Sequence, residues 1–209
     1  MAKTLPGIIY DSDGKTEILD SPTSMFILPM DKDIEYFTNL ESKNRFIRGC
    51  EKLIRQNDRY SKYIHELKTK VGLNHCQVLS KLTDKDCTVE MHHGPIFTLY
   101  DYCEIMIDHY LEKGWKITTF KIADHILSEH WANRIQVIML SVTMHQEIHD
   151  RQAFLNMQQA WGDLHGFLKR YKLNKDLKEK YNRYYDQSMM LDSTTYELLK
   201  LNDKILEKY

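Results

Sequence analysis

The segment from Thr98 to Gly114, TLYDYCEIMIDHYLEKG, constrains the fold more tightly than any other part of the sequence. Its apolar residues recur at intervals of three and four, so they share one face of a helix. Thr98 with Asp101 forms a variant of the capping box, and Gly114 stands where a left-handed glycine ends a helix. The segment therefore predicts an amphipathic helix that other elements must cover on one side.

The remaining patterns alternate between helical and β-type stretches. Helical periodicity occurs in residues 31–70, 122–131, 158–171 and 175–209. Strand-like patterns occur in 8–19 (a hairpin around DSDG), 25–29 (MFILP), 76–93 (two strands around TDKD), 115–120 and 135–140 (IQVIML). The sequence predicts an α+β fold, a mainly helical domain with small antiparallel β elements. The expected divisions are an N-terminal β-hairpin extension (1–30), a basic helical region (31–72), a central domain (73–172) and a helical tail (173–209).

Composition excludes some classes of protein and leaves one charged region of interest. With 42% hydrophobic and 28% charged residues, the 209-residue chain has the composition of a folded domain. A formal net charge of −1 gives no overall basic field for nucleic acid, although a local basic patch can still bind it. The most basic stretch is 43–70, and its candidate phosphate contacts are Arg45, Arg48, Lys52, Arg55 and Arg59.

Cysteine usage and the N-terminal sequence predict a cytoplasmic protein, in the host cytoplasm if the chain is phage-encoded. The four cysteines form no C-x-x-C pair, which favours reduced thiols. The first twenty residues contain no apolar leader core, and no run is long enough to cross a bilayer. We therefore expect no membrane partner.

The histidines provide the candidate chemistry. In TVEMHHGP (88–95), His92 and His93 are neighbours on a predicted strand, so their side chains point to opposite faces. His145 and His149 are four apart, which places them on one face of a helix. The helix motif HQEIH is not the zinc-protease signature, because Gln146 stands where that motif needs its glutamate.

Two motifs together resemble those of the HNH endonucleases. VEMHHGPIF resembles their first motif, and QVIMLSVTMHQEIH (136–149) resembles their closing motif, an apolar strand followed by a helix with two histidines. The resemblance covers about 75 residues, from Cys76 to Asp150. It implies a ββα-metal (His-Me) finger within the helical domain, and the chain also resembles phage-encoded HNH-like proteins.

The resemblance implies roles for individual residues. His93 would be the general base, with Gln136 at the position of the family's asparagine. His92 and His145 would bind a divalent metal, Mg²⁺ or Mn²⁺ or else Zn²⁺, and His149 would be a third ligand, a phosphate contact or a packing residue. The implied function is metal-dependent hydrolysis of phosphodiester bonds in DNA by a phage-encoded endonuclease.

The departures from the family pattern keep alternatives open. Gln136 replaces asparagine, the cysteines of a structural zinc site are absent, and the spacer from Gly94 to Ile135 is long. An alternative first motif is ADHIL (123–127), in which Asp124 would be the ligand and His125 the base, although this stretch is patterned as a helix. The alternative function is a non-catalytic HNH-like phage protein that binds DNA or joins a phage or host protein assembly.

Overall fold

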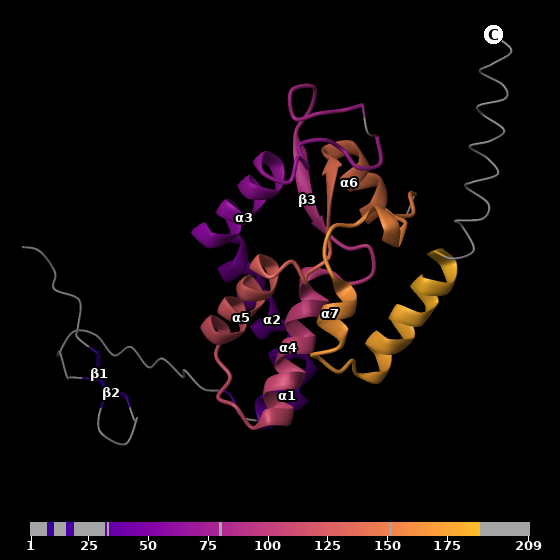
Figure 1. The fold of residues 1–209 in the computed structure, drawn as a ribbon. Helices are drawn as coiled ribbons and strands as arrows, with labels where there is room; N and C mark the ends of the chain where they lie inside the picture. Colours follow the sequence, from indigo (N-terminus) through magenta and orange to yellow (C-terminus); the bar gives the residue numbers. More distant parts are fainter. Residues whose placement is uncertain are drawn as a thin grey trace, which may run out of the picture.

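The computed structural model describes residues 32, 34–79, 81–150 and 152–188, and the backbone of two N-terminal strands. The architecture is mixed α+β and mainly helical, with a small two-stranded sheet, as the sequence predicts (Figure 1). Its elements in chain order are α1 (Ile34–Thr38), α2 (Leu40–Arg55), α3 (Asp58–Thr69), β3 (Val89–His93), α4 (Leu99–Lys113), α5 (Thr119–Trp131), β4 (Val137–Ser141), α6 (Val142–His149), the 3-10 turn η1 (Met157–Gln159) and α7 (Leu164–Leu168). Residues 175–188 form a further helix.

The predicted N-terminal hairpin is confirmed at the level of its two strands. Strand β1 (Ile8–Tyr10) pairs antiparallel with β2 (Thr16–Ile18), with Ile8 opposite Ile18. The strand predicted at 25–29 and the tail beyond residue 188 lie outside the described residues.

Helix α4 forms as its sequence predicts. The Thr98 side chain and the Asp101 carboxylate make both hydrogen bonds of the capping box, and Gly114 ends the helix with φ of 64°. The helix lies in the main core, where Tyr102 and Met106 are fully buried. Residues from α1 through to the 175–188 helix contribute to this one core.

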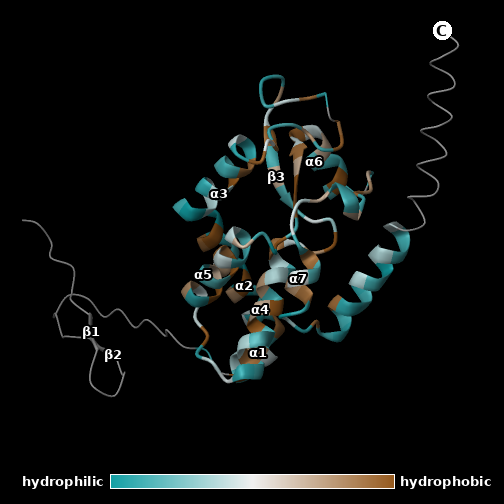
Figure 2. Ribbon diagram, viewed as in Figure 1, coloured by the Kyte–Doolittle hydropathy of each residue, from teal (hydrophilic) through white to brown (hydrophobic). Residues whose placement is uncertain are grey.

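Strands β3 and β4 form the antiparallel sheet that carries the candidate site. Their register sets Val89 opposite Ser141 and His93 opposite Val137. Every residue of β4 is buried, and Figure 2 shows this strand as hydrophobic. Strand β3 alternates instead, with Val89, Met91 and His93 buried while Glu90 is exposed and His92 half-buried. The sheet therefore packs on the core through one face of β3 and presents the other face to α6.

Several predicted elements differ from the structure. Among the described residues of 76–93, which leave out residue 80, only Val89–His93 form a strand, and Thr83 makes an isolated bridge with His75. The strand-like stretch 115–120 contributes a single bridge at Ile117, because Thr118 caps α5 immediately afterwards. The helix predicted over 158–171 is reduced to η1 and α7.

Among the described residues, no helix is both long enough and apolar enough to span a bilayer.

Candidate functional site: a cluster of three histidines

Three histidines converge where α6 lies against the outer face of β3. His92 comes from β3, and His145 and His149 come from successive turns of α6. One nitrogen from each ring can be chosen so that all three lie within 4.8 Å of one another. The centroid of the His92 ring lies 4.9 Å from that of His145 and 5.2 Å from that of His149. The predicted metal ligands are therefore brought together, and we refer to them as the three-histidine cluster.

Local sequence explains why α6 presents two of these rings. Ser141, the last residue of β4, is its N-cap, and its hydroxyl accepts a hydrogen bond from the Met144 amide. The helix therefore starts directly from the end of the strand, with no intervening loop. The four-residue spacing then stacks His145 and His149 one turn apart, with their Nε2 atoms 3.1 Å from each other.

Glu90 orients one of the three rings. Its Oε2 atom lies 2.8 Å from Nδ1 of His145, two residues along the exposed face of β3 from His92. A carboxylate in this position accepts a hydrogen bond from Nδ1–H, which leaves the Nε2 lone pair of His145 facing the cluster. Carboxylate–histidine pairs of this kind are the usual outer support of a metal-binding imidazole.

His92 is held in its neutral, ligand-competent form. Burial, together with the neighbouring His145 and His149, lowers its pKa to about 4. Gly94 leaves room for the ring, because a Cβ atom there would lie 3.1 Å from Nε2 of His92. At neutral pH the cluster therefore offers an imidazole lone pair at His92 rather than a positive charge.

His93 lies on the other face of β3, away from the three-histidine cluster. Only 5% of it is exposed, and its Nε2 atom is 2.9 Å from Nε2 of His130 on α5. Nδ1 of His130 faces the carbonyl oxygen of Ile126 at 2.8 Å, so the proton of the neutral His130 ring is on Nδ1. Nε2 of His130 therefore accepts a hydrogen bond from Nε2–H of His93. The ring of Tyr60 stacks on His93. Burial lowers the pKa of His93 well below its usual value, with His130 acting in the same direction.

Gln136 is buried just before β4 and lies outside the cluster. Its main-chain N–H donates to the hydroxyl of Tyr102 at 3.0 Å, and its main-chain carbonyl accepts a hydrogen bond from the N–H of Gly94. Its side-chain Oε1 atom has no hydrogen-bond partner among the described residues.

The alternative motif at Asp124 and His125 lies on helix α5, as its apolar pattern predicts. Asp124 pairs with Arg59 at 2.5 Å. His125 is held between the hydroxyls of Tyr110 and Tyr171, at 3.1 and 3.0 Å. Neither residue belongs to the three-histidine cluster.

The predicted phosphate contacts are partly neutralised by acidic neighbours. The spacing of Arg45, Arg48, Lys52 and Arg55 places them along one face of α2, where all four are exposed. Arg45 pairs with Glu41 at 2.8 Å, and Arg55 lies 3.9 Å from Glu51. Exposed pairs of this kind contribute little to stability and exchange readily with other anions.

Sequence reasoning missed three residues that shape this region: Glu90, Gly94 and His130. Glu90 could have been found from strand alternation, because it shares a face with His92. Gly94 and His130 carry no such local signal, since their roles depend on which ring packs beside them.

Comparison with known proteins gives one result. No curated protein and no solved structure matches the chain. The family model of Bacteriophage G278-like virion proteins matches residues 26–209, which is most of the chain and includes the whole three-histidine cluster. The chain therefore belongs to the Bacteriophage G278-like virion protein family.

Proposed function

We propose that the chain is an assembly component of the phage particle in which a divalent transition-metal ion joins β3 to α6. The observation that carries the proposal is the convergence of His92, His145 and His149, with ligand atoms within 4.8 Å of one another. The 3.1 Å between the Nε2 atoms of His145 and His149 is close to the ~3.3 Å between two ligands at a tetrahedral zinc ion with bonds of about 2.0–2.1 Å.

The donor set favours some metals over others. Three imidazole nitrogens suit Zn²⁺, Cu²⁺, Ni²⁺ or Co²⁺, whereas Mg²⁺ prefers oxygen ligands in an octahedral arrangement. Of the ions expected from the sequence, Zn²⁺ therefore fits this site better than Mg²⁺ or Mn²⁺. Three protein ligands also leave a fourth position, which a water molecule or a group from a partner protein could fill.

The packing of α6 gives the metal a structural purpose. None of the eight residues of α6, all of them described, is buried. Met144 and Ile148 make only partial contact with a small second core around Ile138 and Leu140. A metal ion bound across the cluster would therefore supply much of the force that holds α6 on the sheet, and its binding free energy would add to the stability of the fold.

The environment of His93 favours assembly over hydrolysis. A general base must come within hydrogen-bonding reach of the water that it deprotonates. His93 is instead buried, hydrogen-bonded to His130 and stacked on Tyr60, and it faces away from the cluster. Membership of a virion protein family also supports a role in a particle built from many protein contacts.

Metal binding by the full chain tests the proposal. Metal-free protein would be titrated with Zn²⁺ by calorimetry and with Co²⁺ by visible absorption, with wild type beside His92→Ala, His145→Ala and His149→Ala. We expect one ion per chain, a tetrahedral Co²⁺ spectrum, and at least roughly a hundredfold weaker binding in each variant, because a lost ligand costs more than the 10–100-fold of a lost outer-shell contact. His65→Ala, at an exposed position on α3, should bind as wild type. Equal affinity in the cluster variants would refute the site.

A second candidate function is metal-dependent cleavage of DNA. It is favoured by the order β3, β4, α6 with histidines on the first strand and the helix, which is the arrangement expected of a ββα-metal finger. The test is nicking of supercoiled plasmid with Zn²⁺, Mn²⁺ or Mg²⁺ and with EDTA. Metal-dependent nicking lost in His93→Ala would establish hydrolysis, and loss in His125→Ala instead would assign it to the alternative motif. No nicking by metal-loaded, folded protein would leave the assembly role.

A further inference from the structure

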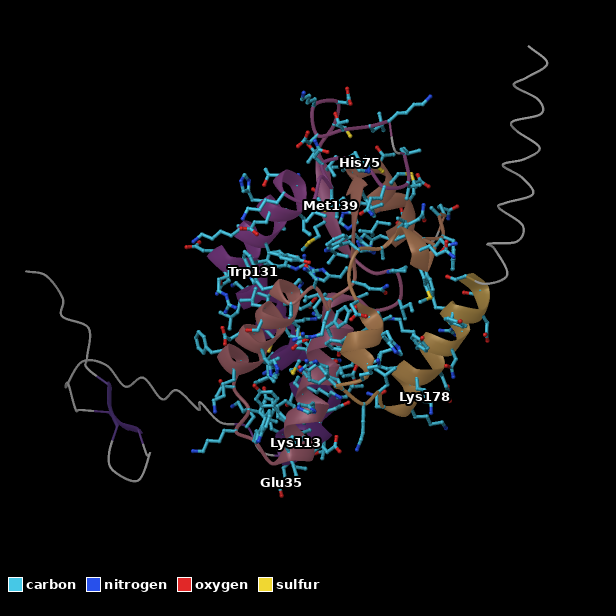
Figure 3. The ribbon with its side chains drawn as sticks, in the orientation of Figure 1. Glu35, His75, Lys113, Trp131, Met139 and Lys178 are labelled. Atoms are coloured by element: carbon cyan, nitrogen blue, oxygen red, sulfur yellow. The ribbon has the colours of Figure 1, made fainter. Side chains whose placement is uncertain are left out.

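Two hollows adjoin at the end of the molecule formed by α1, the C-terminus of α4 and the N-terminus of α5. One, of about 510 Å³, is lined by residues including Tyr110, Trp115 and His125. The other, of about 590 Å³, is lined by residues including Ile34, Leu111 and Trp115. Figure 3 labels Glu35 of α1 and Lys113 of α4 at this same end. Because Trp115 lines both hollows, we treat them as one surface, the Trp115 groove.

The groove has exposed apolar edges. Trp115, which lines both hollows, is 50% exposed, and Ile34, which lines one of them, is 65% exposed. Phe120, the chain neighbour of the lining residue Lys121, is 66% exposed. Single exposed apolar residues are ordinary, but a group that borders two hollows indicates a surface that another apolar segment covers.

The floor of the groove is held rigidly from behind. His125 is fixed at both ring nitrogens, by the hydroxyls of Tyr110 and Tyr171. Tyr171 in turn donates to Glu129 at 2.9 Å, and Arg134 binds that buried carboxylate through two nitrogens. A lining fixed in this way is preformed for its occupant, so docking costs little reorganisation.

The path of the chain indicates the occupant. The amide of Lys32 donates to the carbonyl of Ile117 at 3.0 Å in an antiparallel bridge. An antiparallel continuation of this bridge would lead residues before Lys32 toward Thr118 and Phe120. Pro29 is three residues upstream, so at ~3.3 Å per residue it can reach about 10 Å from the bridge, within range of the exposed side chains at the start of α5.

The sequence just upstream of this bridge is the apolar run MFILP, residues 25–29. The match to the virion protein family begins at residue 26, so all of this run except Met25 belongs to the part of the chain that the family model covers. We propose that residues 25–29 of the same chain dock in the Trp115 groove and cover Trp115 and Phe120. The short connection to Lys32 gives this segment a high effective concentration at the groove, which favours it over the same segment of a second copy.

Hydrogen–deuterium exchange of the full-length chain, read by mass spectrometry, tests this docking. The amides of residues 26–28 should be protected in wild type at low micromolar concentration. Phe120→Ser should raise their exchange roughly ten- to a hundredfold, the change expected when one large apolar contact is lost. Phe26→Ser should do the same and should also increase acrylamide quenching of Trp115. Leu40→Ser removes an apolar side chain that is 71% exposed on α2, where neither Leu40 nor its chain neighbours line a hollow, and it should leave exchange at 26–28 unchanged.

Three results would overturn the proposal. The first is free exchange of residues 26–28 in wild type. The second is an equal effect of Leu40→Ser and Phe120→Ser. The third is protection that disappears on tenfold dilution together with a dimer in sedimentation, which would assign the groove to the segment of a second copy.

Discussion

Replacing Glu90 by glutamine tests how the three-histidine cluster is built. The substitution keeps the size of the side chain but removes the charge 2.8 Å from Nδ1 of His145. Loss of such an outer-shell carboxylate weakens metal binding about 10–100-fold, which corresponds to ~1.4–2.7 kcal/mol. Because the Glu90 side chain is 46% exposed, solvent screens the pair, and we expect the lower half of that range.

The expected loss can be measured as thermal stability. At a fixed excess of Zn²⁺, the bound ion stabilises the fold by an amount that falls directly with affinity. For a chain of this length, 1 kcal/mol shifts the melting temperature by about 2–4 °C. The Zn²⁺-induced rise in melting temperature should therefore be ~3–8 °C smaller in Glu90→Gln than in wild type, while the two proteins should melt within about 2 °C of each other in EDTA.

A matched control separates this effect from the loss of any surface charge. Glu66→Gln removes an ion pair with Lys70 on helix α3 that, at 2.7 Å, is about as short as the pair of Glu90 with His145. It should leave the Zn²⁺-induced rise unchanged. If Zn²⁺ raises the melting temperature of Glu90→Gln as much as that of wild type, the reasoning that Glu90 orients His145 for a metal is refuted.

Three other substitutions or conditions give distinct results. In EDTA, the free energy of unfolding should fall by at least about 3 kcal/mol as pH drops from 6.5 to 4, and urea unfolding across this range checks it. Burial lowers the pKa of His130 and of His92 to about 4 and that of His93 well below its usual value, so the unfolded chain takes up protons that the folded chain excludes. Gly94→Ala should weaken Zn²⁺ binding roughly tenfold in calorimetry, because its Cβ would lie 3.0 Å from the His92 ring. Gly162→Ala should destabilise the fold by more than ~2 kcal/mol in urea, as φ is 121° and Cβ would lie 2.4 Å from a main-chain oxygen.

Each of these has a control. His130→Phe should reduce the stability change between pH 6.5 and 4 by up to about 3 kcal/mol and leave the part that comes from His92 and His93, and an unchanged slope would mean that His130 does not contribute. Gly72→Ala, with φ of 85° and nothing within 4 Å of the added Cβ, should cost only about 1 kcal/mol. If Gly72→Ala lowers the free energy of unfolding as much as Gly162→Ala does, crowding against the main chain does not explain the loss in Gly162→Ala. Normal Zn²⁺ affinity in Gly94→Ala would show that the His92 ring can move aside.

Helices whose signals are local could be predicted from the sequence. The caps of α4 at Thr98 and Gly114 carry their own hydrogen-bonding and backbone preferences, so no distant contact is needed to place them. The four-residue spacing of His145 and His149 likewise defines their shared face. The resemblance to the two HNH motifs implied a strand with His92, a second strand and then the helix, and this order predicted that His92 lies near His145 and His149.

Elements whose structure depends on distant contacts could not be predicted in the same way. Residues 76–88 have strand-favouring composition, yet among those that the structure describes only Thr83 takes part in a bridge, with His75. Gln77 instead bonds to Met139 of β4 through both its main-chain amide and its side-chain oxygen. The surroundings of His93 depend on Tyr60 and His130, which are remote in sequence and carry no motif. A histidine that looks like a catalytic base in the strand pattern is thus enclosed by residues that only the tertiary fold brings to it.

If the three-histidine cluster binds a metal ion as proposed, the alternation along β3 makes that binding a check on correct strand pairing. A slip of β3 by one residue would turn His92 into the core and bring His93 to α6, since side chains on a strand change face at every position. Such a slipped chain would lose its contact between His93 and His130 and its metal ligand at once. Only molecules paired with His93 opposite Val137 could hold the ion, so Zn²⁺ would selectively retain correctly registered chains during folding and before they enter a particle.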